Sequence, residues 1–180
     1  DALRKKYPQL SLRIVPVDFS NPFDALESEH MDCLLYWPEL KPDSVEYLPL
    51  FEGNIHAYLN KKHPLCQKQS VSIKDIVSIP HIVFGNISGP TDPAYLRDVP
   101  QEMKKNIKLI KVPDVMTSRR MLELNQGVVL SPTGGILSDS EEIREVTIAE
   151  YSRRMQMGLC YKKDNRNPAL MELLNYLKNE

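Results

Sequence analysis

The segment 114–135, DVMTSRRMLELNQGVVLSPTGG, constrains the fold more than any other part of this sequence. Its first half predicts a short helix that begins at Thr117 and Ser118, because both residue types accept hydrogen bonds from the free amides of a first helical turn. Asn125 and Gly127 are expected to end that helix, since both tolerate the left-handed conformation found at many helix C-termini.

The second half of this segment predicts a buried strand. Residues 128–130, VVL, are too few and too rich in β-branched side chains for another helix, and residues 131–135, SPTGG, have the composition of a turn. A strand directly behind a helix with a polar start is a basic part of an α/β ligand-binding fold. The amides at the start of such a helix favour anions, so the segment predicts an anion-binding helix end that needs a facing cleft.

The N-terminal part of the sequence has the same α/β character. Residues 10–17, LSLRIVPV, alternate apolar and polar side chains with the period of a strand. Residues 20–22, SNP, place a cap residue type before a proline and predict the start of a helix. Residues 32–37, DCLLYW, form an apolar run typical of a strand inside a parallel sheet. The order strand, helix, strand predicts a βαβ unit.

The middle of the sequence predicts two strands and a capped helix. Residues 45–51 and 54–60 are expected to be separate strands that are linked by a turn at 52–53, EG. Ser72 is expected to begin a short helix, because Asp75 lies at the third helical position and completes the spacing of a capping box.

The remaining segments alternate between strands and helices. Residues 80–84, 107–112 and 155–161 are expected to be strands. Asp92-Pro93 and Asn167-Pro168 each place a cap residue before a proline, so a helix is expected after each pair. The leucines of the last helix recur at the spacing of an amphipathic helix.

Three of the expected strand-to-helix loops share a polar character: residues 20–22, 86–89 and 117–118. Ligands of open parallel sheets bind outside the carboxyl ends of the strands, where such loops gather. The three loops therefore predict a polar cleft, although the capping of three helices would explain the same residues.

Composition excludes several classes of function for this chain alone. A formal net charge of −1 argues against a surface that holds a nucleic-acid backbone, and no apolar run is long enough to span a membrane. Cys33, Cys66 and Cys160 are far apart in the sequence and none belongs to a CxxC pair, which favours free thiols in a reducing, cytoplasmic protein.

No pattern of catalytic or metal-binding residues is present. The four histidines are scattered, and Cys66 lies three residues after His63 without further ligands nearby. The sequence has no glycine-rich phosphate loop and no nucleophile motif. We therefore expect no enzyme activity, no catalytic residues, no metal and no cofactor.

Residues 47–80 carry a family resemblance. They contain, in order, Pro49-Leu50, a strand, His63-Pro64-Leu65, a short helix and a strand. This order resembles the effector-binding domain of LysR-type transcriptional regulators. Residues 22–35 and 121–132 resemble two further segments of that family, so the similarity covers nearly the whole chain.

The resemblance has departures. Glu29 and Asn125 stand where the family often has glycine. The first strand of the first lobe and the winged helix-turn-helix, which precede this region in the family, are expected upstream of Asp1. Part of the family's effector pocket is therefore not contained in these residues.

The resemblance implies an α/β fold of two Rossmann-like lobes with a ligand cleft between them, like a type 2 periplasmic binding protein. Lobe I would comprise residues 1–65 and 152–180, and lobe II residues 66–151. A small-molecule effector, expected to be a carboxylate, would close the lobes and rearrange a homodimer, which becomes a tetramer in the full-length protein. DNA would be bound only through the N-terminal domain.

The resemblance also implies a set of effector-binding residues from the ends of strands and the starts of helices. They are Ser20, Asn21, Tyr36, Trp37, Phe84, Gly85, Asn86, Ser88, Thr117, Ser118, Pro132 and Thr133. Arg119 and Arg120 could add positive charge. The alternative is a free-standing solute-binding protein of the periplasmic type, which shares the fold; a winged helix-turn-helix upstream would support the regulator and a signal peptide the alternative.

Overall fold

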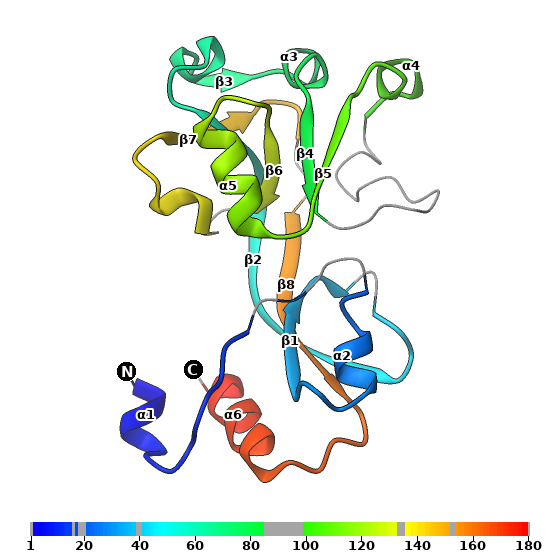
Figure 1. Cartoon of the computed structure of the whole chain (residues 1–180), viewed down its shortest axis with the longest axis vertical. Coiled ribbons are helices and arrows are strands. Elements are labelled where there is room, and N and C mark those ends of the chain that lie inside the picture. Colours follow the sequence, from blue (N-terminus) through cyan, green and yellow to red (C-terminus); the bar gives the residue numbers. More distant parts are fainter. Residues whose placement is uncertain are drawn as a thin grey trace. The chain divides into compact units, whose positions relative to one another are not determined.

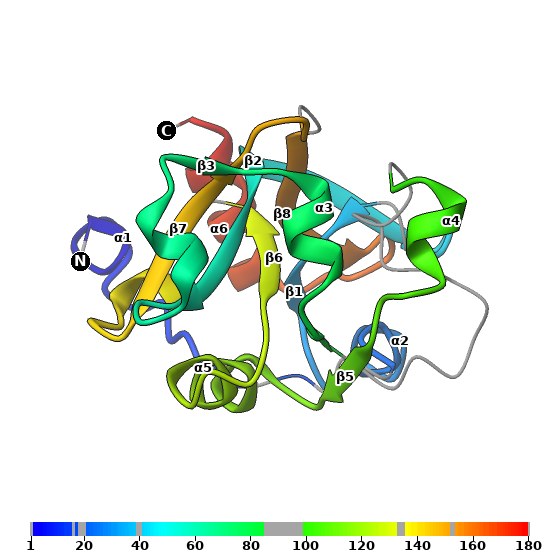
Figure 2. The same ribbon diagram turned by 90° about the horizontal axis from the view of Figure 1, so that it is seen from above.

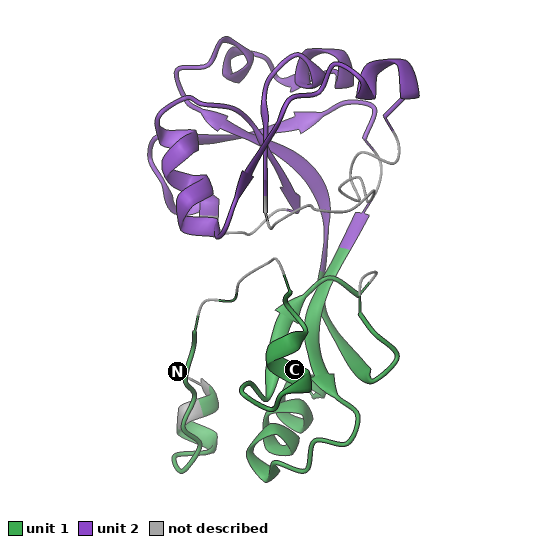
Figure 3. Cartoon of the chain, turned by 45° about the vertical axis from the view of Figure 1, so that its right-hand side comes forward, with its two compact units in different colours: residues 1–17, 21–51, 156–180 green, residues 18–20, 52–155 purple. Residues whose placement is uncertain are grey.

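The structure is a computed structural model, and it describes residues 2–15, 17, 21–38, 41–84, 99–132, 136–151 and 154–179. The chain divides into two compact units (Figure 3). Unit 1 comprises Asp1–Val17, Asn21–Phe51 and Gln156–Glu180, and the rest of the chain belongs to unit 2. The predicted lobe borders, 65/66 and 151/152, differ from this division in position, and the lobe assignment stays a prediction.

Unit 1 is a small sheet with helices. Its elements are α1 (Ala2–Lys6), α2 (Asp24–Glu27), β1 (Cys33–Tyr36), the first part of β2 (Val45–Asn60), most of β8 (Arg154–Lys162) and α6 (Pro168–Lys178) (Figure 1). Asn167 caps α6 by accepting a hydrogen bond from the Ala169 amide at 3.0 Å, as predicted. Leu170 and Leu174 of α6 pack on Leu159 of β8 and form the core of this unit.

Two predictions for unit 1 are wrong. Residues 11–15 and 17 form no strand: no strand of the described residues pairs with them, and the Ile14 side chain is 94% exposed. The helix predicted to begin at 20–22 begins at Asp24 instead, with Phe23 as its N-cap residue. Asn21 contributes only its carbonyl oxygen, which accepts from the Asp24 amide at 3.3 Å.

The interpretation of β1 as a strand inside a parallel sheet is also wrong. β1 pairs antiparallel with β8, with Leu34 opposite Cys160. Leu35 is 51% exposed, so the apolar run does not mean burial on both faces. The predicted βαβ unit is therefore not formed by the described residues of this region.

β2 is one continuous strand rather than two strands joined by a turn. Residues 52 and 53 lie inside it, and the border between the units falls between Phe51 and Glu52. β8 crosses the other border, between Met155 and Gln156. Glycine adopts extended conformations as readily as turns, so Glu52-Gly53 alone does not define a turn.

Unit 2 is the larger α/β unit. Besides the rest of β2 it contains η2 (Pro64–Gln67), β3 (Ser70–Val71), α3 (Ile73–Val77), β4 (His81–Phe84), α4 (Gln101–Lys104), β5 (Leu109–Val112), α5 (Val115–Glu123), β6 (Val129–Pro132), η4 (Ile136–Asp139) and β7 (Ile143–Ile148). Figure 2 shows α5 following β5 and leading into β6. β6 and β7 pair antiparallel with β2, and β4 pairs parallel with β5.

The core of unit 2 lies between these strands and α5. Tyr58 of β2, Ile82 of β4, Val129 of β6 and Leu122 of α5 are almost fully buried together. The predicted strands at 80–84, 107–112 and 128–130 are present as β4, β5 and β6 with shifted ends. β7 was not predicted, and the helix predicted after Asp92-Pro93 lies outside the described residues.

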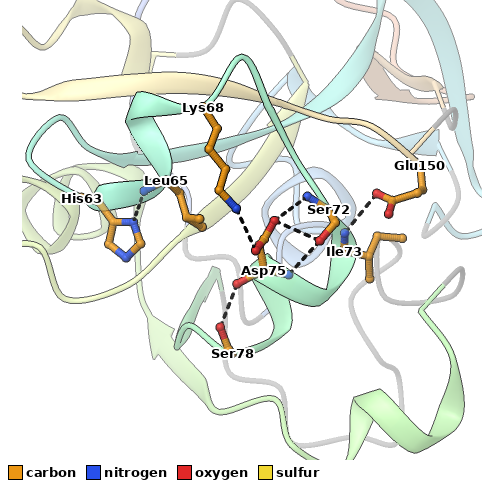
Figure 4. A network of polar contacts seen from close by, with 8 residues as sticks. All are labelled: His63, Leu65, Lys68, Ser72, Ile73, Asp75, Ser78 and Glu150. Carbon is orange, nitrogen blue, oxygen red and sulfur yellow. Dashed lines mark hydrogen bonds and ion pairs between the residues drawn. The ribbon is translucent and has the colours of Figure 1, made fainter.

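The capping box predicted for α3 is confirmed. Ser72 Oγ accepts from the Asp75 amide at 3.2 Å, and the Asp75 carboxylate accepts from the Ser72 amide at 2.9 Å. Lys68 approaches Asp75 at 3.1 Å, and Glu150 accepts from the Ile73 amide at 3.1 Å (Figure 4). The network fixes the start of α3 to neighbouring parts of unit 2.

Candidate functional site

The start of α5 is capped by Asp114, and the prediction of Thr117 and Ser118 as cap residues is wrong. The helix begins at Val115, and Asp114 Oδ1 accepts from the Thr117 amide at 2.8 Å. The Thr117 hydroxyl donates to Asp114 Oδ2 at 3.0 Å. Residues 114–118 contain three residues of types that cap helices, and Asp114, the first of them, is the N-cap of α5.

Ser118 faces the interior of unit 2. Its side chain is fully buried, and its hydroxyl donates to the Val115 carbonyl at 2.7 Å inside the same helix. Thr117 is half-buried in the first turn. Of the two predicted hydroxyls, only that of Thr117 therefore lies at the start of α5, and both already have acceptors within the chain.

The start of α5 carries a negative charge of its own. Hydrogen bonds from the Thr117 amide and hydroxyl lower the pKa of Asp114, so its carboxylate is ionised at neutral pH. Arg119 and Arg120 do not offset this charge, because their side chains contact Glu123 at 3.2 and 2.8 Å, toward the C-terminus of α5. Asp114 is thus the anion that the helix dipole stabilises.

The parallel pairing of β4 and β5 brings two predicted site segments together. Phe84, the last residue of β4, lies opposite Val112, the last residue of β5. Asp114 follows two residues later and begins α5. The carboxyl end of β4 and the start of α5 therefore meet at one edge of unit 2, which is where open α/β sheets bind ligands.

In unit 1, predicted site residues gather at the carboxyl end of β1. Tyr36 is buried, with its ring centroid 5.3 Å from Phe23 and 5.0 Å from Trp37, in edge-to-face contacts. Burial raises the pKa of Tyr36 to about 12, so its hydroxyl stays protonated. Trp37 is half-buried, whereas Asn21 is exposed. The two rings lie in contact at the end of β1.

The remaining predicted site residues divide into two groups. Pro132 is buried at the end of β6, where its carbonyl oxygen lies 3.4 Å from the Tyr58 hydroxyl. The others lie outside the described residues: Ser20, Gly85, Asn86, Ser88 and Thr133.

A polar cluster that the sequence did not predict lies beside Pro132. The Tyr58 hydroxyl donates to Glu145 Oε2 at 2.8 Å, and His56 Nδ1 lies 3.3 Å from Glu145 Oε1. His56 and Tyr58 share one face of β2, a two-residue spacing visible in the sequence. No sequence signal points to Glu145, which is 87 residues away from Tyr58.

His63 and Cys66 do not form part of a metal site in the described chain. The His63 ring accepts from the Leu65 amide at 3.3 Å as the cap of η2, and Cys66 Sγ lies 3.3 Å from the Asn60 carbonyl oxygen. Burial lowers the pKa of His63. Among the described residues there is no group of three or more metal-ligand side chains. None of the described helices is long and apolar enough to cross a membrane.

Comparison with known proteins identifies a family and a fold. Residues 1–180 match the protein family described as LysR substrate binding domain. No curated protein sequence matches significantly.

Solved structures share the fold at low sequence identity. The effector-binding domain of QuiR in complex with shikimate is 19% identical, with a TM-score of 0.70 over 99% of this chain and 88% of that one. The BenM effector-binding domain with its effector benzoate is 14% identical, with a TM-score of 0.66 over 99% and 82%. HinK, a LysR family regulator from Pseudomonas aeruginosa, is 19% identical, with a TM-score of 0.72 over 99% and 62%.

Proposed function

This chain belongs to the LysR substrate-binding domain family, and on that premise we propose that it senses a small carboxylate and transmits its binding to a DNA-binding part of the same regulator. Domains of this family are regulatory ligand-binding domains and not enzymes. The chain is therefore the effector-binding domain of a transcriptional regulator, with the α/β fold of type 2 periplasmic binding proteins.

The observation that carries the proposal is the meeting of β4 and α5 at one edge of unit 2. Phe84 lies opposite Val112, and the start of α5 follows at once. We propose that the effector contacts this edge and the residues after Phe84, and that Tyr36 and Trp37 of unit 1 contribute an apolar wall. Pro132 and Asn21 are the other described members of the proposed site.

The ligands of two similar proteins and the charges of α5 support a carboxylate as the proposed effector class. QuiR binds shikimate and BenM binds benzoate, and both ligands are small carboxylates. Asp114 already accepts the hydrogen bond of the Thr117 amide. We therefore propose that other donors, in the residues that follow β4, bind the effector carboxylate, with Asp114 near enough to weaken anion binding.

For transmission, we propose closure of the two lobes around the effector, with bending of β2 and β8 where they pass between units. The regulator would act as a homodimer, and as a tetramer at full length, in the cytoplasm. Met116 on α5 and Leu124 at the C-cap of α5 are exposed and offer apolar surface for a second copy. DNA binding would reside in a separate N-terminal domain.

A thermal-shift comparison tests the proposal, with benzoate, shikimate and benzylamine as probes. A carboxylate present at about 100 times its Kd stabilises a protein by about 2.7 kcal/mol and raises Tm by roughly 5–10 °C at this size. We expect at least one carboxylate to do so, and benzylamine to have no effect.

Two variants sharpen this test. Asp114→Asn keeps a side-chain acceptor for the cap but removes the charge, so it should tighten carboxylate binding. Trp37→Ala should weaken binding. A carboxylate-induced shift that neither variant changes would show that the ligand binds elsewhere, and the absence of any shift would count against the proposed effector class.

A further inference from the structure

The cluster of Tyr58, Glu145 and His56 joins separate parts of unit 2 at one hydroxyl group. Tyr58 is fully buried among Val129 and Leu137, so its hydroxyl needs partners inside the protein. It donates to Glu145 Oε2 at 2.8 Å and lies 3.4 Å from the Pro132 carbonyl oxygen.

A third contact reaches η4. Leu137 of η4 packs in the same buried cluster as the Tyr58 side chain. Pro132 is the last residue of β6 and Leu137 lies in η4, so the Tyr58 side chain packs with the element before and the element after residues 133–135. Because Glu145 belongs to β7, the hydrogen bond between Tyr58 and Glu145 also connects β6 and η4 to β7.

Glu145 determines the direction of these hydrogen bonds. A carboxylate is a stronger acceptor than a carbonyl, and the shorter contact is to Glu145, so the phenol proton is donated there. His56 Nδ1 lies 3.3 Å from the second carboxylate oxygen, Oε1. Burial, followed by the Glu145 contact, raises the pKa of Tyr58, which keeps the donor proton in place.

We propose that Glu145, acting through the Tyr58 hydroxyl, is a positioning residue. It holds η4 and the end of β6, which includes Pro132, in the geometry that effector binding needs. The link to effector binding rests on the proposed function, which places Pro132 among the effector-binding residues. The positioning itself is a property of the ligand-free domain. It requires an acceptor at position 145 and a hydroxyl at position 58.

Hydrogen–deuterium exchange on the whole chain, without ligand, tests the positioning. Tyr58→Phe keeps the ring and removes the hydroxyl. It should speed exchange in β6 and η4 about fivefold, the change in a local opening equilibrium expected for one lost hydrogen bond, while α3 and α6 keep wild-type rates. Glu145→Leu should have the same effect, and Glu145→Gln should restore near wild-type exchange, because its amide oxygen can still accept.

The control is Ser72→Ala, which removes the cap of α3 in the same unit and should speed exchange in α3 alone. Wild-type exchange of β6 and η4 in both Tyr58→Phe and Glu145→Leu would overturn the proposal. An equal increase throughout unit 2, with no rescue by Glu145→Gln, would also overturn it, since it would indicate a general packing role. The absence of a thermal shift with any carboxylate would count against the proposed function and leave this exchange result standing.

Discussion

Asn125 and Gly127, which follow α5, have different physical roles although both were predicted to end the helix because they tolerate a left-handed conformation. Asn125 has φ 55°, which confirms the prediction for that residue. Gly127 is required for space instead, because a Cβ there would collide with the Pro80 carbonyl oxygen. That carbonyl accepts from the Val128 amide at 2.9 Å. The glycine thus allows the chain to enter β6 beside β4.

Replacing Gly127 tests this close approach. Gly127→Ala should lower the free energy of unfolding by about 1–3 kcal/mol, because backbone atoms on both sides must separate. Asn125→Gly is the matched control and should stay within about 0.5 kcal/mol of wild type, because glycine adopts the left-handed conformation freely. Urea denaturation measures both, and a Gly127→Ala protein as stable as wild type would contradict the collision.

At the scale of elements, two short helices of unit 2 are held at their starts by aspartate carboxylates. Asp75 belongs to the capping box of α3, and Asp114 caps α5. Hydrogen bonds from backbone amides are the main cause that lowers the pKa of each carboxyl. The folded state therefore binds protons less readily than the unfolded state at these two groups.

The stability of the folded chain is therefore expected to depend on pH through these two carboxyl groups. The folded-state pKa of Asp114 lies below the ordinary value of 3.8, so its contribution to stability is present above that pH and is lost as the pH falls through the lowered pKa. Asp114→Asn should lower the urea midpoint at pH 7 and match wild type only at a pH below that lowered pKa. Urea titrations across this range check the result, and a difference that is the same at every pH would contradict a charge effect.

At the scale of the whole molecule, the two units differ in how well they bury apolar side chains. Seven of the nine large exposed hydrophobic residues among the described residues belong to unit 1: Leu12, Ile14, Val15, Leu35, Leu50, Phe51 and Met171. Unit 2 has the larger buried core around Tyr58 and Leu122. Exposed apolar surface contributes nothing to stability, so unit 1 is expected to unfold first.

The single tryptophan allows a direct test. Trp37 belongs to unit 1, so its fluorescence follows that unit, whereas far-UV circular dichroism follows both. The fluorescence transition in urea should have a lower midpoint than the dichroism transition. Trp37→Phe with a tryptophan introduced by Phe84→Trp in unit 2 is the control and should move the fluorescence midpoint upward. Coincident transitions in both proteins would show a single cooperative unit.

The sequence by itself determined features that depend on neighbours within one helical turn or one strand. These include the capping box of α3, the start of α6 at Asn167, the left-handed Asn125 and the apolar strands β4 and β6. Each follows from hydrogen bonds or steric limits that act over three or four residues. The family patterns, which extend over nearly the whole chain, also led to the correct family and fold class.

Only the tertiary structure decided features that need a distant partner or a choice among equivalent local patterns. No described strand pairs with the segment 10–17 that was predicted as a strand, and β2 passes unbroken through the expected turn. The cluster at Tyr58 needs a carboxylate 87 residues away. In the segment 114–135 several residue types could cap the helix, and in the structure the cap is Asp114. The predicted anion-binding helix start therefore already has a carboxylate of the protein itself beside it.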